Sequence, residues 1–132
     1  MPAPALALGP LGQIAMPVRD PARGLAFYRD ILRLRFLFEA PPLSFFDCGG
    51  VRLMLSVPST PEYDHPGSIL YFEVPDIAAA HAELSGRGVR FKDAPHLIAR
   101  LPDHELWMTF FEDSEGNTLA LMAEVPHGGA AA

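Results

Sequence analysis

The sequence predicts an α+β fold in which two βαβββ modules pair into an eight-stranded, partly open barrel with the helices outside. The main observation is an internal duplication: residues 45–55 recur as residues 111–121, with identical residues at five positions and an offset of 66. A second pair of segments, residues 14–20 and 70–76, agrees at an offset of 56. A period of about 60 residues is too long for a solenoid repeat and indicates one supersecondary unit duplicated within a domain. Because neither unit alone buries both faces of its sheet, we expect the two units to pair.

The first module begins with a short apolar run that predicts a strand over residues 13–18. Asp20 then offers an N-cap, and Pro21 suits the first position of a helix. Apolar residues at helical spacing predict that this helix is amphipathic and covers residues 21–33. Turns at Pro41-Pro42 and Gly49-Gly50 separate three further strands, over residues 36–38, 43–47 and 51–57.

The second module repeats this order. A strand over residues 69–74 leads to a helix that Asp76 caps and that Gly86 and Gly88 end. The ten extra residues of this module fall in a long loop from Lys92 to about His104. The remaining strands are predicted over residues 89–91, 106–111 and 118–124. The chain therefore divides into an N-terminal extension (1–11), the first module (12–58), a linker (59–67), the second module (68–125) and a disordered tail (126–132).

Composition and charge argue against several classes of partner. The net charge of −6 over 132 residues argues against nucleic acid and anionic membranes. The single cysteine, Cys48, cannot form an internal disulfide, which suits a reducing cytoplasm. Residues 1–12 are apolar but too short for a membrane span, and they lack the basic start of a signal peptide. We therefore expect a cytoplasmic protein with no nucleic-acid or membrane partner, in which Cys48 is a partly buried thiol rather than a nucleophile.

Two segments carry a resemblance to a known family. They are Val18-Arg19-Asp20-Pro21, followed by Phe27-Tyr28-Arg29-Asp30, and the turn Glu112-Asp113-Ser114-Glu115-Gly116-Asn117 before the last strand. Together with the βαβββ duplication, they make the chain similar, over residues 12–125, to the vicinal oxygen chelate superfamily. That superfamily includes glyoxalase I, bleomycin-resistance proteins and extradiol dioxygenases. The resemblance implies the fold but leaves the activity open, because this fold hosts both enzymes and binding proteins.

The resemblance also implies where a metal ion would be held. In metal-using members, the ligands lie at the start of each module's first strand and in the middle of each module's last strand. Those positions are occupied here by Gln13, Ile69, Met54 and Ala120. Only Gln13 offers an oxygen, and a divalent ion needs about three or more suitable protein donors. We expect no metal there; the alternative is one divalent ion at a non-standard site drawn from His96, His104, Glu73 and Glu124.

Strand alternation predicts which side chains share a face with those four positions. The face is expected to be mostly apolar with a few directional polar groups, which is typical of small-molecule pockets. The structural alternatives are an ion pair of Arg52 with Glu73 or Glu124, and an amphipathic core role for Tyr71. The candidate ligand-binding residues on this face are Gln13, Arg52, Met54, Tyr71, Glu73, Met122 and Glu124.

The long loop of the second module is rich in titratable side chains. Between His96 and Trp107 lie two histidines, an arginine, two acids and the only tryptophan of the chain. Because long loops often carry function, we expect this segment to cover the pocket, with His96 and Trp107 contacting the ligand. The alternative is that His96 and His104 only hold the loop in place through hydrogen bonds to the backbone. The catalytic candidates are His96, His104, Glu105, Tyr71 and Glu73.

Three functions fit this sequence. A metal-free small-molecule-binding protein of the bleomycin-resistance kind is favoured by the missing ligands and by the acidic chain, which attracts cationic compounds. The alternatives are a glyoxalase- or dioxygenase-type enzyme with a non-standard metal, and a metal-free enzyme that transfers protons through His104 with Glu105 or Tyr71 with Glu73. In each case we expect a homodimer, because the resemblance implies modules that pair between chains and because an open sheet leaves edges that need cover.

Overall fold

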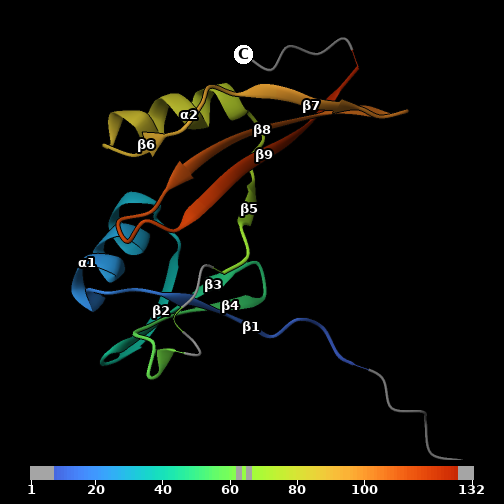
Figure 1. The fold of residues 1–132 in the computed structure, drawn as a ribbon. Helices are drawn as coiled ribbons and strands as arrows, with labels where there is room; N and C mark the ends of the chain where they lie inside the picture. Colours follow the sequence, from blue (N-terminus) through green and yellow to red (C-terminus); the bar gives the residue numbers. More distant parts are fainter. Residues whose placement is uncertain (1–7, 62–63, 65–66, 128–132) are drawn as a thin grey trace, which may run out of the picture.

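The computed structural model describes residues 8–61, 64 and 67–127, and its strands form two sheets, one from each module (Figure 1). The first sheet consists, in spatial order, of β1 (Gln13–Pro17), β4 (Val51–Ser56), β3 (Leu43–Cys48) and β2 (Arg35–Ala40). The second sheet consists of β5 (Leu70–Glu73), β9 (Thr118–Pro126), β8 (His104–Glu112) and β6 (Arg90–Phe91), and β7 (His96–Arg100) also pairs with β8.

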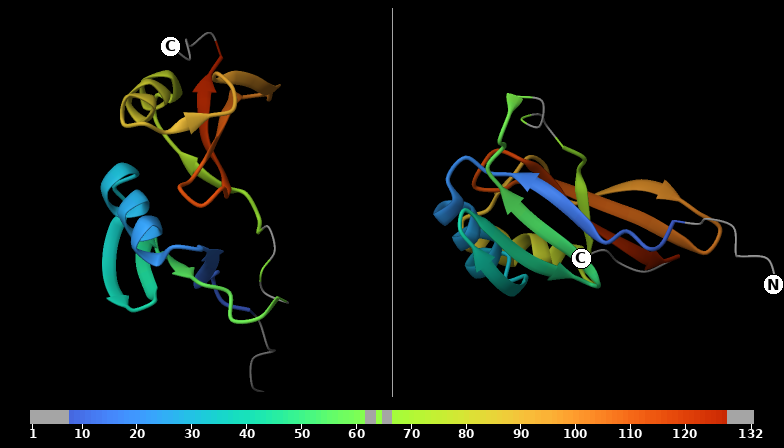
Figure 2. Two further views of the ribbon diagram at one scale, coloured as in Figure 1. Left: turned by 60° about the vertical axis from the view of Figure 1, so that its left-hand side comes forward. Right: turned by 90° about the horizontal axis from the view of Figure 1, so that it is seen from below.

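The two sheets have the same topology, which confirms the predicted α+β fold of two βαβββ modules. In each module the first strand pairs in parallel with the last: β1 with β4, and β5 with β9. The other pairs are antiparallel. Within the described residues the strands form no closed barrel, and the left view of Figure 2 shows the two sheets apart.

Both helices begin at the predicted caps. Helix α1 (Pro21–Ala26) follows Asp20, whose side chain accepts a hydrogen bond from the N–H of Arg23. The helix continues as a π-helical segment, Phe27–Ile31, and ends two residues earlier than predicted. The predicted end of the helix at residue 33 was wrong. Arg33 has a φ of 57°, which is not helical and turns the chain toward β2.

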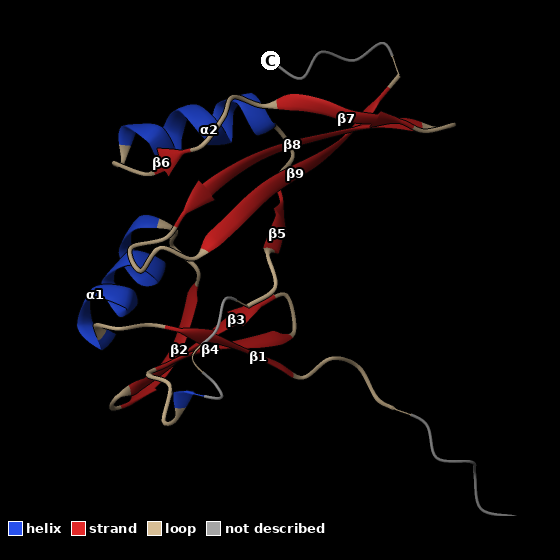
Figure 3. Cartoon of the chain, in the orientation of Figure 1, coloured by secondary structure: helices blue, strands red, loops and turns tan. Residues whose placement is uncertain are grey.

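The second helix, α2 (Ile77–Gly86), lies along one face of the second sheet (Figure 3). Asp76 caps it by accepting from the N–H of Ala79. The helix ends at Gly86, and the following Gly88 has a φ of 91°, which glycine adopts without steric cost.

The predicted long loop after Lys92 was wrong. Residues 96–100 form β7, a ninth strand, which makes a hairpin with β8, and β8 begins at His104 rather than at residue 106. Exposure alternates along β7, as expected for a strand with period two. Strand β9 likewise continues to Pro126, inside the predicted tail, and residues 128–132 lie outside the described part of the chain.

A single hydrophobic core joins the two modules. Leu53 and Leu55 from the first sheet and Leu119 and Leu121 from the second are buried in it, on the helix-covered faces where alternation predicted them. Tyr28 is completely buried beside them. The modules of one chain therefore meet through their helix-covered faces, and the opposite faces of both sheets point away from the common core.

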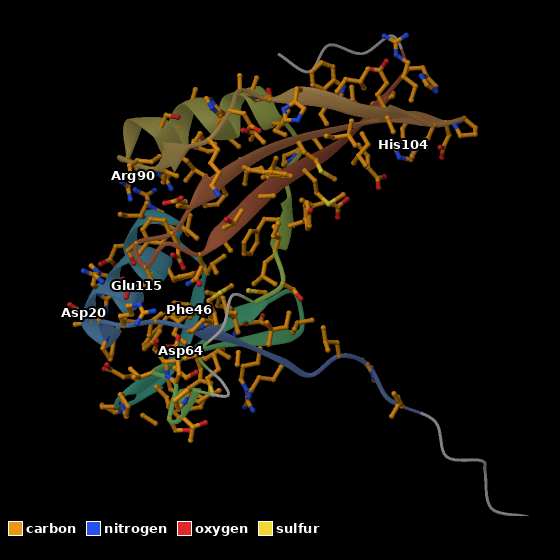
Figure 4. The ribbon with its side chains drawn as sticks, viewed as in Figure 1. Asp20, Phe46, Asp64, Arg90, His104 and Glu115 are labelled. Carbon is orange, nitrogen blue, oxygen red and sulfur yellow. The ribbon has the colours of Figure 1, made fainter. Side chains whose placement is uncertain are left out.

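The turn between β8 and β9 fastens the second module to the first. The Glu115 carboxylate accepts from the backbone N–H groups of Arg19 at 2.8 Å and Asp20 at 2.9 Å, and from Nε of Arg23 at 2.6 Å. Figure 4 shows Glu115 beside Asp20 at the start of α1. Burial alone would raise the pKa of Glu115, but the hydrogen bonds from Arg23, Asp20 and Arg19 outweigh it and lower the pKa to about 2.

Replacing Glu115 by glutamine should therefore remove a pH-dependent part of the stability. The folded pKa of about 2 lies below the ordinary value of 4.5, so this stabilisation is complete above about pH 4.5 and is lost as the pH falls toward 2. The shift corresponds to about 3 kcal/mol, which we reduce to about 2 kcal/mol because Arg23 is half-exposed and screened. Urea denaturation should show a constant difference in stability between the two proteins above about pH 4.5, and this difference should disappear as the pH falls toward 2. Parallel curves for wild type and variant would contradict this assignment.

Candidate functional site

The faces of the two sheets that point away from the core carry most of the predicted ligand-binding residues. We call them the first outer face (first sheet) and the second outer face (second sheet). The predicted residues Gln13, Arg52 and Met54 lie on the first outer face, and Tyr71, Glu73, His96, Met122 and Glu124 lie on the second, as the strand registers show.

The first outer face carries a pair of stacked aromatic rings and an arginine that is held in place by its neighbours. Arg52 Nε donates to Gln13 Oε1 at 2.7 Å, and the Arg52 guanidinium carbon lies 5.3 Å from the centroid of the Phe45 ring. Phe38 stacks on Phe45 with ring centroids 4.4 Å apart. In the next register row Met54 lies opposite Phe45. Arg52 is thus paired with Gln13, and among the described residues it forms no ion pair with Glu73 or Glu124.

The second outer face contains two register rows. Met122 pairs with Glu73 on one side and with Met108 on the other, and Met108 pairs with His96, so these four residues cross the sheet in one row. The neighbouring row contains Tyr71, Ala120 and Phe110, with the Tyr71 and Phe110 ring centroids 6.0 Å apart.

Tyr71 lies at the surface of this face rather than in the core, since it is 44 % exposed. The face therefore consists of aromatic and thioether side chains with a carboxylate at one end of a row and an imidazole at the other.

The structure does not bring the catalytic candidates together. His104 Nδ1 donates to Asp103 Oδ1 at 2.8 Å, which lowers the pKa of Asp103, and Figure 4 places His104 at the far end of the hairpin from Glu115. Glu105 alternates with His104 along β8 and accepts from the Trp107 indole N–H at 3.2 Å. Among the described residues no hydrogen bond joins His104 to Glu105 or Tyr71 to Glu73.

The predicted cover over the pocket was wrong. Residues 96–107 lie within the second sheet, because β7 and β8 form a hairpin there. Trp107 packs against the core, on the opposite side of β8 from Met108. His96 Nδ1 lies 2.9 Å from the carbonyl oxygen of Ala94, a contact that holds the start of β7, as the structural alternative proposed.

The four positions that hold metal in related proteins offer no suitable donor set. Gln13 Oε1 already accepts from Arg52, and Gln13 Nε2 lies 3.7 Å from Met54 Sδ. Ile69 and Ala120 have no donor atom on their side chains. Nor does the described part of the chain contain three or more His, Cys, Asp or Glu residues grouped closely enough to hold a metal ion. These residues do not fit a divalent ion at this position.

Several outer-face residues were missing from the sequence-based list. They are Phe38, Phe45, Met108 and Phe110, which come from the middle strands of the two modules. Alternation along the predicted strands over residues 43–47 and 106–111 contains the signal for three of them, Phe45, Met108 and Phe110. Phe38 reaches this face only because the register shifts between Phe36 and Phe38. The prediction considered only the first and last strand of each module, where the metal ligands of related proteins lie.

Two cavities lie at the junction of the modules. The larger, of about 760 Å³, lies between β5 and the end of the first sheet that contains Cys48, and Tyr71 and Glu73 reach its edge. The smaller, of about 510 Å³, lies beside Glu115 and the start of the linker. No residue between His96 and Trp107 lines either cavity.

These features define a βαβββ protein with open apolar sheet faces, and the chain belongs to the glyoxalase/bleomycin resistance protein/dioxygenase superfamily. The sequence model of that family matches residues 11–121. A comparison with curated proteins found no match. No helix in the described residues has the length and apolar character that crossing a membrane requires.

Solved structures of the same fold come from proteins with different described roles. A superfamily member from Sphaerobacter thermophilus has a TM-score of 0.76 and 23% identity, over 90% of this chain and 100% of that one. TnmS3, an antibiotic-binding protein from Streptomyces sp. CB03234, has a TM-score of 0.72 and 24% identity, over 90% of this chain and 98% of that one. Lactoylglutathione lyase from Agrobacterium tumefaciens has a TM-score of 0.63 and 20% identity, over 91% of this chain and 94% of that one. At these identities the likeness shows the fold alone.

Proposed function

We propose that this protein binds a small organic molecule with an aromatic or apolar part, without a metal ion, on its outer faces. The observation that carries the proposal is the row Glu73, Met122, Met108 and His96 beside the aromatic pair of Tyr71 and Phe110. A mostly apolar surface with a few polar groups at its ends is typical of a ligand site. The fold shared with an antibiotic-binding protein supports a binding role.

We further infer a homodimer in which the first outer face of one copy lies against the second outer face of the other. Among the described residues, no hydrogen bond or ion pair joins the two outer faces within one chain, because the helix-covered faces form the common core. Phe38 on the first face is 47% exposed and Tyr71 on the second is 44% exposed. Contiguous exposed apolar surface is typical of protein–protein contacts and of ligand-binding sites. Each ligand site would then contain residues of both copies.

The charge distribution favours a cationic ligand in this site. Glu73 and Glu124 edge the second outer face, and the chain carries a net charge of −6. Glu73 forms no ion pair with a described residue, so its carboxylate is available to a ligand. Carboxylates beside aromatic rings stabilise aromatic cations through both charge and ring contacts. The single cysteine supports placing the protein in the cytoplasm.

The cationic aromatic dye thioflavin T provides a direct test of this function. We expect a saturable increase in its fluorescence and a higher melting temperature of the protein, both unchanged by EDTA. Tyr71→Ala should weaken binding about tenfold, because a stacked aromatic contributes about 1 kcal/mol or more. Phe36→Ala is the matched control: Phe36 is 38% exposed but contacts Phe46 on the core side of the first sheet. Absence of binding, or its loss in EDTA, would contradict the proposal.

A further inference from the structure

The larger of the two cavities lies where the two modules differ at two pairs of equivalent positions. In the second module, the Glu115 carboxylate reaches the start of α1 and accepts from its backbone N–H groups. The offset of 66 makes Gly49 the counterpart of Glu115, and the offset of 56 makes Leu84 the counterpart of Tyr28. The turn at Gly49 therefore lacks the carboxylate that Glu115 supplies, and α2 lacks the phenol that Tyr28 supplies. The turn at Gly49 lines the open space of about 760 Å³ instead.

The lining of this cavity is apolar with arginines at its edge. Ile14, Leu34 and Leu53 contribute apolar surface, and Arg33 and Arg35 contribute the positive charge. A volume of about 760 Å³ falls within the range of about 300–1,000 Å³ that small-molecule sites occupy. The acidic groups of the lining are Asp47 and Glu73, which come from different modules.

Arg33 is the cation that is free to bind a ligand. Asp47 Oδ2 lies 3.7 Å from Arg35 Nη1, and Asp47 Oδ1 accepts from the N–H of Gly50, so these groups are already paired. The Arg33 side chain makes no hydrogen bond or ion pair with any described residue. Its φ of 57° lies in the left-handed region, where glycine is strongly favoured, so an arginine is held here at a backbone cost.

We propose that this cavity is a second binding site, for a small amphiphile whose apolar chain lies against Ile14, Leu34 and Leu53 and whose carboxylate pairs with Arg33. A guanidinium binds a carboxylate through two parallel hydrogen bonds, which gives the site its preference for an acid. The cavity shares Tyr71 and Glu73 with the second outer face, but Met54 and Met122 do not line it, and its proposed ligand contacts are Arg33, Ile14, Leu34 and Leu53. The inference therefore does not rest on the function proposed for those faces.

Cys48 provides a reporter for this site, since it lines the cavity and is the only cysteine of the chain. Burial and the neighbouring Asp47 raise the pKa of the Cys48 thiol, so its reaction with iodoacetamide should be slow and sensitive to further covering. The probe ligand is decanoate, and mass spectrometry measures the rate of alkylation of the full-length protein. We expect decanoate to slow alkylation about tenfold at saturation, and decylamine, which Glu73 would attract, to slow it much less.

Arg33→Gly removes the guanidinium without damaging the fold. Glycine adopts a φ of 57° readily, so the melting temperature should not fall, whereas half-protection of Cys48 should require about tenfold more decanoate. Arg29→Ala is the control, because Arg29 is paired with Asp30 and does not line the cavity. Three results would overturn the proposal: no saturable protection by decanoate, equal protection by decylamine, or half-protection of the Arg33→Gly variant at the same decanoate concentration as the wild type.

Discussion

Replacing Asp113 by asparagine should lower the free energy of unfolding by about 3 kcal/mol. Asp113 is 2% exposed, and its two oxygens accept four hydrogen bonds. One oxygen accepts from the backbone N–H groups of Glu115 and Asn117, and the other from the Tyr28 hydroxyl and the Asn117 amide. An asparagine in the same position turns its own N–H₂ group toward donors, which leaves a buried donor without an acceptor.

The internal duplication supplies a matched control for this prediction. Asp47 is the equivalent residue of the first module, and it accepts only from the N–H of Gly50 and pairs at 3.7 Å with Arg35, whose side chain is 77% exposed. Asp47→Asn should therefore cost less than about 1 kcal/mol. Urea denaturation at neutral pH measures both variants, and the midpoints should separate while the slopes stay equal. Equal midpoints for the two variants would show that the Tyr28–Asp113 contact does not fasten the modules.

A lysine on either outer face should reduce thioflavin T binding about tenfold or more. Met54→Lys places the new charge on the first outer face, and Met122→Lys places it on the second; both side chains are partly exposed, so the fold should tolerate them. The added cation repels the dye and replaces apolar contact area, and both effects act in the same direction. Fluorescence titration of each variant measures the loss. Normal binding by the Met54→Lys variant would contradict a site made from both faces.

The parts of the fold that sequence reasoning predicted depend on local patterns. Asp20 and Asp76 cap their helices as predicted, because an aspartate at this position accepts a hydrogen bond from a free N–H of the first turn. Successive side chains of a strand point to opposite faces of the sheet. This alternation predicted which face of each sheet packs in the core, the face that carries Leu53, Leu55, Leu119 and Leu121. Alternation also predicted that Met54, Tyr71 and Met122 lie on the faces away from the core.

The remaining features depend on contacts between distant parts of the chain. Strand β7 is only five residues long and lies between Pro95 and Pro102, so it gives no strong local signal; its pairing with β8 defines it. Alternation along the predicted strand over residues 106–111 already assigns Trp107 to the face opposite Met108, so the expectation that Trp107 contacts the ligand disregarded that pattern. The packing of the two modules depends on contacts such as Tyr28–Asp113, which join residues 85 positions apart.

Mixing the Met54→Lys and Met122→Lys proteins tests most directly whether each ligand site is shared between two copies. Each variant alone should bind thioflavin T weakly, and light scattering should give twice the chain mass of 14.4 kDa for the wild-type protein. In a mixed dimer, one site combines both lysines and the other contains neither. After random exchange of equal amounts, about one quarter of the wild-type number of tight sites should return. If mixing restores no tight binding, the two outer faces do not form a site between copies of this protein.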